Sequence, residues 1–120
     1  LYMVLDFPFP LKDRDVIVKG KISKDANGVV SVKNKAITQG KALNPDYIRL
    51  KNYQGDWSFQ ALANNKVKIT TSGYADPEGS IPLSVANMFV QQQPYQMLQK
   101  MNLELKKPNK KFAELPAILR

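Results

Sequence analysis

The change of pattern that decides the fold lies in residues 66–107, which read KVKITTSGYADPEGSIPLSVANMFVQQQPYQMLQKMNLELKK. Residues 66–75 alternate between apolar and polar side chains, which is typical of a half-buried antiparallel strand. Residues 81–107 are rich in Leu, Met, Gln, Asn and Lys, which form helices more readily than strands. Pro82 suits a first helical turn, and Pro94 is expected to kink the helix or split it in two. The stretch therefore predicts a last strand followed by a long helix.

The same alternation runs backward from this stretch to the N-terminus and predicts a sheet. The expected strands, in meander order, cover residues 1–7, 15–23, 29–38, 47–53, 57–62 and 66–75. Asn27-Gly28 and Asn64-Asn65 suit tight turns, and Gln54-Gly55-Asp56 is interpreted as another turn. Asp15, Arg49 and most lysines fall on the outward face, and the lysines are interpreted as dispersed over it. The sequence thus predicts a twisted antiparallel sheet with one covered face.

Composition narrows the function classes. The 120 residues fit one domain, and 43% hydrophobic and 23% charged residues are ordinary for a globular protein. The chain has no Cys and no His, which excludes disulfides, thiolate metal sites and the usual base at neutral pH. We therefore expect no metal and no cofactor. A membrane-spanning run and a signal peptide pattern are both missing, so the expected location is the cytoplasm.

The first residues of the chain predict an unpaired strand at the edge of the sheet. Leu1 opens directly into a predicted strand and is not a Met. An edge strand without a partner invites pairing with another chain. We therefore expect the chain to be part of something longer and to self-associate through this edge when isolated.

Three local motifs, taken together and in order, resemble the C-terminal part of START domains, the lipid-transfer domains related to steroidogenic acute regulatory protein. They are FPFPLKDRD at residues 7–15, GDW at residues 55–57, and DPEGSIP at residues 76–82 followed by residues 83–87. The resemblance covers most of residues 1–107, and the junction motif at residues 76–82 is its most specific part. The chain is similar to a bacterial member of this family.

The resemblance implies an α+β helix-grip fold, in which an antiparallel meander sheet curves around a long C-terminal helix and encloses an apolar cavity. Residues 1–107 would form a partial START-like domain, residues 108–120 a C-terminal tail, and the family's N-terminal part would be missing. Cholesterol-binding members place an arginine in the cavity where this chain has Gly20. A sterol held by that charge is therefore not expected.

The candidate site residues fall into two groups. Inward strand positions and one stripe of the helix would contact a ligand, with Asn34, Asn52 and Thr71 bonding to one another, to water or to the ligand. These ligand-binding candidates are Val18, Val32, Asn34, Ala36, Asn52, Phe59, Ile69, Thr71, Val85, Met88 and Phe89. Structural roles are expected for Arg14 (as an ion pair with its acidic neighbours that anchors the loop), Asp15, Trp57, Asp76, Pro77, Gly79 and Pro82.

Three functions compete at this stage. The favoured one is a non-enzymatic module that binds or transfers a lipid or another hydrophobic small molecule in a cavity between sheet and helix. Its basic surface, with a net charge of +8 and a pI near 9.7, would allow transient contact with an anionic membrane. The alternatives are a helix-grip enzyme (aromatase/cyclase-like or a hydrolase) and, less favoured, a basic nucleic-acid-binding module. The recognised partner would thus be a hydrophobic small molecule and no nucleic acid.

Overall fold

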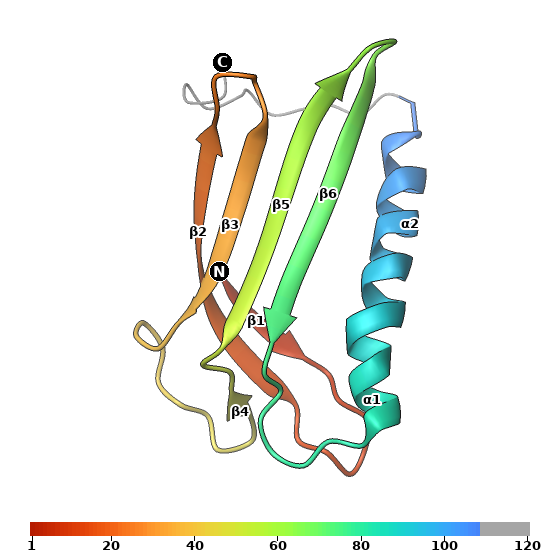
Figure 1. Cartoon of the computed structure of the whole chain (residues 1–120). Helices are drawn as coiled ribbons and strands as arrows, with labels where there is room; N and C mark the ends of the chain where they lie inside the picture. The colour runs from red at the N-terminus through yellow and green to blue at the C-terminus, as the bar shows by residue number, and fades with distance from the viewer. Residues whose placement is uncertain (109–120) are drawn as a thin grey trace. The chain divides into compact units, whose positions relative to one another are not determined.

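The computed structural model describes residues 1–108, so the predicted tail lies outside the described residues apart from Pro108. Within the described part, residues 1–78 form one compact unit and the chain from Gly79 onward forms a second. The first unit is the sheet and the second is helical. Each is described by itself below (Figure 1).

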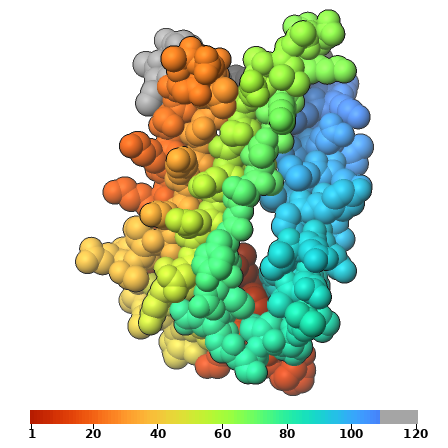
Figure 2. Space-filling model, viewed as in Figure 1, coloured from red at the N-terminus to blue at the C-terminus, as the bar shows by residue number. Residues whose placement is uncertain are grey.

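The sheet unit is a curled antiparallel sheet. Its strands are β1 (Tyr2–Leu5), β2 (Arg14–Lys24), β3 (Val30–Ile37), β4 (Ile48–Arg49), β5 (Tyr53–Leu62) and β6 (Lys66–Ala75). They are ordered β1-β2-β3-β5-β6 by antiparallel pairing, with β4 paired to β2. Both hairpin turns lie at one end of the sheet in Figure 1, and β4 lies toward the other. Figure 2 shows β5 and β6 side by side along their length, as their register requires.

The two hairpin turns form where the sequence predicts them. Gly28 has φ +79°, and its N–H donates to the carbonyl of Asp25 at 3.0 Å. Asn64 and Asn65 both have positive φ, at 62° and 56°. Two consecutive positive φ angles match the twist of paired strands, and Asn tolerates them better than most residues. These two turns set the registers of β2 with β3 and of β5 with β6.

The predicted strand at residues 47–53 is wrong in extent and in pairing. Only Ile48–Arg49 is a strand, and it runs parallel to β2, so the sheet is not a simple six-strand meander. The next strand already begins at Tyr53, and Gly55 and Asp56 lie inside it rather than in a turn. A strand of two residues has too few side chains to show an alternating pattern.

The core of the sheet unit lies where β2 has partners on both sides. β1 pairs with residues 14–17 of β2 along one edge, and β4 and β3 pair along the other. Val16, Val18 and Leu50 are buried there, with Met3, Leu5, Ala36 and Tyr53 packed against them. Residues 14–18 are all buried, so the predicted outward position of Asp15 is wrong. Strand alternation cannot show burial when both faces are covered.

The helical unit contains a continuous run of helix from Leu83 to Leu105. It consists of α1 (Leu83–Asn87), a π-helical segment (Met88–Gln92) and α2 (Gln93–Leu105). Pro94 lies in the first turn of α2, and the helix runs through it without a gap, so the expected split into two helices is replaced by a change of helix type directly before this proline. Proline has no N–H and its ring crowds the carbonyl four residues earlier, and a π-helical turn accommodates both. None of the helices in residues 1–108 is long and apolar enough to span a membrane.

Candidate functional site

One face of the sheet carries the side chains expected to meet a hydrophobic ligand. Directly opposed residues in neighbouring strands point to the same face, so the register defines its members. This apolar face comprises Val18, Ile22, Val30, Val32, Asn34, Ala36, Tyr53, Trp57, Phe59, Ile69 and Thr71. The predicted grouping of the inward positions on β2, β3, β5 and β6 is therefore confirmed.

Trp57 lies at the centre of the apolar face. It is opposed by Val32 on β3 and by Thr71 on β6, and its ring stacks on Phe59 with centroids 6.3 Å apart and planes at 11°. All four of these side chains are half-buried. They form an aromatic and aliphatic surface that is still partly exposed to water. Burial of this exposed area would drive the binding of an apolar molecule.

A row across the apolar face has almost no side chains. Gly20, Asn34, Gly55 and Gly73 oppose one another in consecutive strands, so three of the four positions have no Cβ. Two polar atoms occupy the space: a Cβ on Gly20 would lie 2.7 Å from Asn34 Oδ1, and a Cβ on Gly55 would lie 2.8 Å from the Tyr53 hydroxyl. Neither side chain hydrogen-bonds to another described residue. The row thus places two hydrogen-bonding groups on an otherwise apolar surface.

The predicted ligand-binding residues of the sheet are not equivalent in the structure. Ala36 packs against the buried cluster of Val16, Val18 and Leu50, which favours a packing role. Thr71 donates its hydroxyl to the carbonyl of Asp56 at 3.2 Å, so this side chain is partly satisfied within the sheet. Asn52 lies in an exposed bend before β5, so its predicted inward position is wrong.

The predicted helical contacts lie in the second unit. Val85 belongs to α1, and Met88 and Phe89 to the π-helical segment. All three are half-buried, while Asn87 and Val90 beside them are exposed. The spacing places them on one side of this short helical stretch, as the stripe predicted.

A buried ion pair that the sequence did not predict lies at the β4 end of the sheet. Arg49 binds Asp15 in a bidentate geometry, with Nε to Oδ1 at 2.8 Å and Nη2 to Oδ2 at 2.9 Å. Arg49 also donates to the carbonyls of Lys41 and Ala42, and the Tyr2 hydroxyl donates to Asp15 Oδ2 at 2.9 Å. Asp15 and Arg49 are 1% and 8% exposed, so the predicted outward position of Arg49 is wrong.

The electrostatics of this cluster follow from its contacts. The hydrogen bonds from Arg49 hold the pKa of Asp15 below its usual value. Burial, followed by the hydrogen bond to Asp15, raises the pKa of Tyr2. Both groups therefore keep one protonation state at neutral pH, with Asp15 charged and Tyr2 neutral. This behaviour fits a structural cluster and does not suit a general acid or base.

Arg14 has a structural position, but its partners differ from those predicted. It donates from Nε to the carbonyl of Pro77 at 2.9 Å, from Nη2 to that of Glu78 at 2.8 Å, and from Nη1 to that of Lys12. Its guanidinium also lies 4.3 Å from the ring centroid of Phe7. The predicted ion pair with acidic neighbours is therefore wrong. Arg14 instead ties residues 77–78, just after β6, to the start of β2.

The junction motif has a defined turn geometry. Asp76 Oδ1 accepts a hydrogen bond from the N–H of Glu78 at 3.0 Å, and Glu78 and Gly79 have φ of +53° and +77°. This contact within the turn agrees with the structural role expected for Asp76. The motif therefore presents two backbone carbonyls to Arg14.

The buried polar groups of the sheet unit are paired in its core, and other polar groups lie on the apolar face. Across the described residues, no group of three or more Asp, Glu, His or Cys side chains could hold a metal ion. The buried charges are paired with one another or with carbonyls, and the polar groups of the apolar face include the Asn34 amide and the hydroxyls of Tyr53 and Thr71. Such a surface can orient a ligand by hydrogen bonds while most of the binding energy comes from apolar burial.

The chain has sequence similarity to a longer protein. No family model matches the chain. An uncharacterized protein of Pseudomonas aeruginosa is 31% identical over 97 residues, which cover 81% of this chain and 48% of that protein. The chain thus spans about half the length of the curated relative it matches.

A solved structure has the same fold. It is the crystal structure of a STAR-related lipid transfer protein fragment from Xanthomonas axonopodis, with a TM-score of 0.73 and 24% sequence identity. The match covers 88% of this chain and 59% of that fragment. The predicted START-like helix-grip fold is confirmed by this similarity.

Proposed function

We propose that this chain is part of a START-family module that binds a hydrophobic small molecule, such as a lipid, without chemically changing it. The proposal combines the fold, which matches that of a lipid transfer protein, with the apolar face of the sheet. The ligand would lie on the apolar face and be held chiefly by its removal from water. At roughly 0.8 kcal/mol for each buried CH₂, a long acyl chain needs few polar contacts.

The observation that carries this proposal is the glycine row beside the aromatic pair. The missing Cβ atoms of Gly20 and Gly55 leave room for Asn34 Oδ1 and the Tyr53 hydroxyl, so two polar groups would face a ligand in this row. The Trp57–Phe59 stack lies one and two rows further along the same strands. An elongated molecule could therefore rest on the aromatic surface with its polar end at the glycine row.

The polar end of the ligand would bind Asn34 and Tyr53. Asn34 offers an amide with donors and an acceptor, and Tyr53 a hydroxyl. A hydroxyl, ester or amide on the ligand would satisfy both better than a charged group, because no cation or anion lies in this row. Gly20 also favours a neutral polar group on the ligand, because this position of the row carries no charged side chain.

The helical residues Val85, Met88 and Phe89 remain predicted ligand contacts. A Met side chain adapts to ligands of different shape. Ala36 is excluded from the proposed contact set because it packs in the core. Asn52 is excluded because it is exposed in a bend.

Two adjacent threonines of β6 allow a matched test of the apolar face. Thr71 is half-buried on that face opposite Trp57, whereas Thr70 is exposed on the other face opposite Ser58. A glutamate at position 71 would put a charge against the ligand, and a glutamate at position 70 would not. We expect Thr71→Glu to weaken binding of the neutral probe N-phenyl-1-naphthylamine by about tenfold or more, and Thr70→Glu to leave it unchanged.

The readout is the enhanced fluorescence of the probe, titrated to saturation, together with urea unfolding of each variant. A lipid extract should compete with the probe, and native mass spectrometry should then show which lipid mass remains bound. Equal affinity in the two folded variants, or no saturable binding by the unmodified chain, would contradict the proposal.

A further inference from the structure

The face of the sheet opposite the apolar face concentrates positive charge. Lys19 is directly opposed to Lys35, and Lys21 to Lys33, in the β2–β3 pair. All four are exposed, and they are called the lysine cluster below. The sequence interpretation of dispersed lysines is therefore wrong for these residues, because the register of the hairpin gathers them.

The spacing of the cluster makes its charges act together. Directly opposed residues are about 5 Å apart and alternate residues of one strand about 7 Å apart, so the four Cα atoms lie within about one Debye length at physiological salt. Like charges opposed across two strands destabilise a sheet. Among the described residues, the acidic side chain closest to the lysine cluster in the strand register is Asp56, which lies opposite Lys33. The cluster thus retains a net positive charge that the fold itself does not need.

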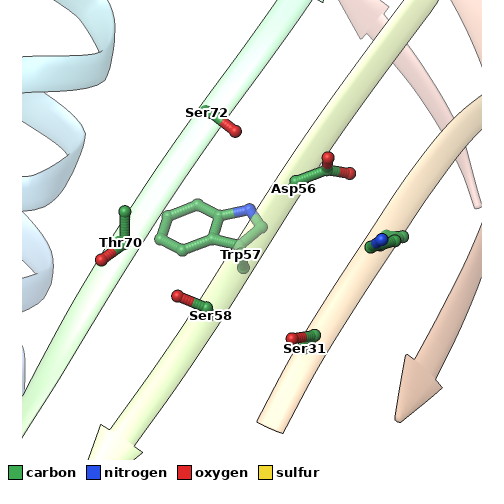
Figure 3. A pocket seen from close by; sticks show the side chains of 7 residues that line it. Ser31, Asp56, Trp57, Ser58, Thr70 and Ser72 are labelled. Carbon is green, nitrogen blue, oxygen red and sulfur yellow. The ribbon is translucent and has the colours of Figure 1, made fainter. Parts of the chain in front are cut away.

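The same face continues toward β6 without an apolar patch over these rows. An open hollow next to the cluster is lined by Ser31, Lys33, Asp56, Ser58, Thr70 and Ser72, and by Trp57, which the register assigns to the apolar face. Figure 3 shows the hydroxyl side chains of the hollow on three strands. Lys68 lies further along β6 on this face, opposite Gln60. The carboxylate of Asp56 among the hydroxyls disfavours a single bound phosphate. The face is suited instead to a broad anionic surface, to which each lysine adds its own attraction.

We infer that the lysine cluster docks the protein on the surface of an anionic lipid bilayer. This inference rests on the proposed function, since a protein that exchanges a hydrophobic ligand must reach a membrane. The stacked aromatic pair lies on the opposite face, and Tyr74 is the aromatic residue of these four strands that shares the face with the cluster. Single-stranded nucleic acid binding relies on several stacking aromatics beside the cations, so this face favours the bilayer.

The test uses the complete 120-residue chain and vesicles of about three parts phosphatidylcholine to one part phosphatidylserine. The variant Lys21→Gln/Lys33→Gln removes one opposed pair. Its control, Lys51→Gln/Lys100→Gln, removes the same charge from an exposed bend and from α2. We expect the cluster variant to lose about 25-fold in vesicle affinity, from about fivefold for each lysine, and the control to lose far less.

Three further results decide the inference. Binding should disappear on pure phosphatidylcholine and weaken steeply with added salt. The urea midpoint of the cluster variant, followed by Trp57 fluorescence, should stay close to that of the unmodified chain, because the variant removes both the like-charge pair of Lys21 and Lys33 and the unlike-charge pair of Lys33 and Asp56. If the variant does not fold, Lys19→Gln/Lys35→Gln replaces it.

The inference is overturned if the control loses as much affinity as the cluster variant, or if the unmodified chain ignores phosphatidylserine. It is also overturned if the lysine cluster is needed to bind an oligothymidylate while vesicles are not bound. Titration with N-phenyl-1-naphthylamine, a neutral probe, reports on the apolar face alone. Loss of docking with intact probe binding would therefore leave the proposed function standing.

Discussion

Replacing Arg49 with methionine should expose how much the sheet depends on its buried ion pair. Arg49 makes two hydrogen bonds to Asp15 and one each to the carbonyls of Lys41 and Ala42. Arg49→Met keeps much of the side-chain length but leaves Asp15, only 1% exposed, with the Tyr2 hydroxyl as its remaining side-chain partner. Breaking a buried pair in this way costs about 3–5 kcal/mol, and the partial exposure of Arg49 places the expected cost near the lower end, at about 3 kcal/mol.

The pH dependence of this cost gives a second, independent readout. Arg49 lowers the pKa of Asp15 in the folded state, so the pair stabilises the fold above the unfolded pKa of about 3.8 and the stabilisation is lost as pH falls through the lower folded value. In Arg49→Met the buried carboxyl of Asp15 has no cation beside it, so the pKa of Asp15 should rise. The difference in stability between the two proteins should therefore be largest near pH 7 and should shrink below about pH 4.

The assay is urea unfolding followed by Trp57 fluorescence, since Trp57 is the single tryptophan and lies in β5. The double variant Asp15→Asn/Arg49→Met serves as control, because it removes the buried charge together with its partner. It should recover part of the stability lost in Arg49→Met. A loss below about 1 kcal/mol at pH 7, or a loss that does not change with pH, would refute the reasoning.

Three other substitutions, two of them with a comparison variant, test separate features. Arg14→Met removes the donors that hold the carbonyls of Pro77 and Glu78, so limited proteolysis should cut faster near Gly79, and an unchanged cleavage rate would contradict this role. Asn65→Val places a β-branched residue at a φ of 56° and should lower the free energy of unfolding by about 1–2 kcal/mol in urea, whereas Asn65→Gly should cost nothing. Gly73→Ala would bring a Cβ to 3.2 Å from the carbonyl oxygen of Gln54 and should lower the thermal midpoint. Gly28→Ala, whose Cβ would meet no neighbouring atom within 4 Å, would lower the midpoint only through the positive φ of this position.

Local signals in the sequence determined most of the elements. The alternation in residues 15–23, 29–38 and 66–75 agrees with β2, β3 and β6 to within one residue at each end. The tight turns at Gly28 and Asn64-Asn65 follow from residues that tolerate positive φ. The change from π-helix to α-helix just before Pro94 follows from its missing N–H. These features depend on neighbours along the chain, so a single sequence carries them.

Only the tertiary structure decided which distant residues meet. Arg49 and Asp15 are 34 positions apart, and each looks like an ordinary outward charge in its own strand. Their pairing depends on β4 lying parallel to β2, which two residues cannot signal. The glycine row and the lysine cluster likewise arise from the registers of neighbouring strands. Register is a property of two strands at once, so alternation in each strand alone predicts the face of a side chain but not the side chain across from it.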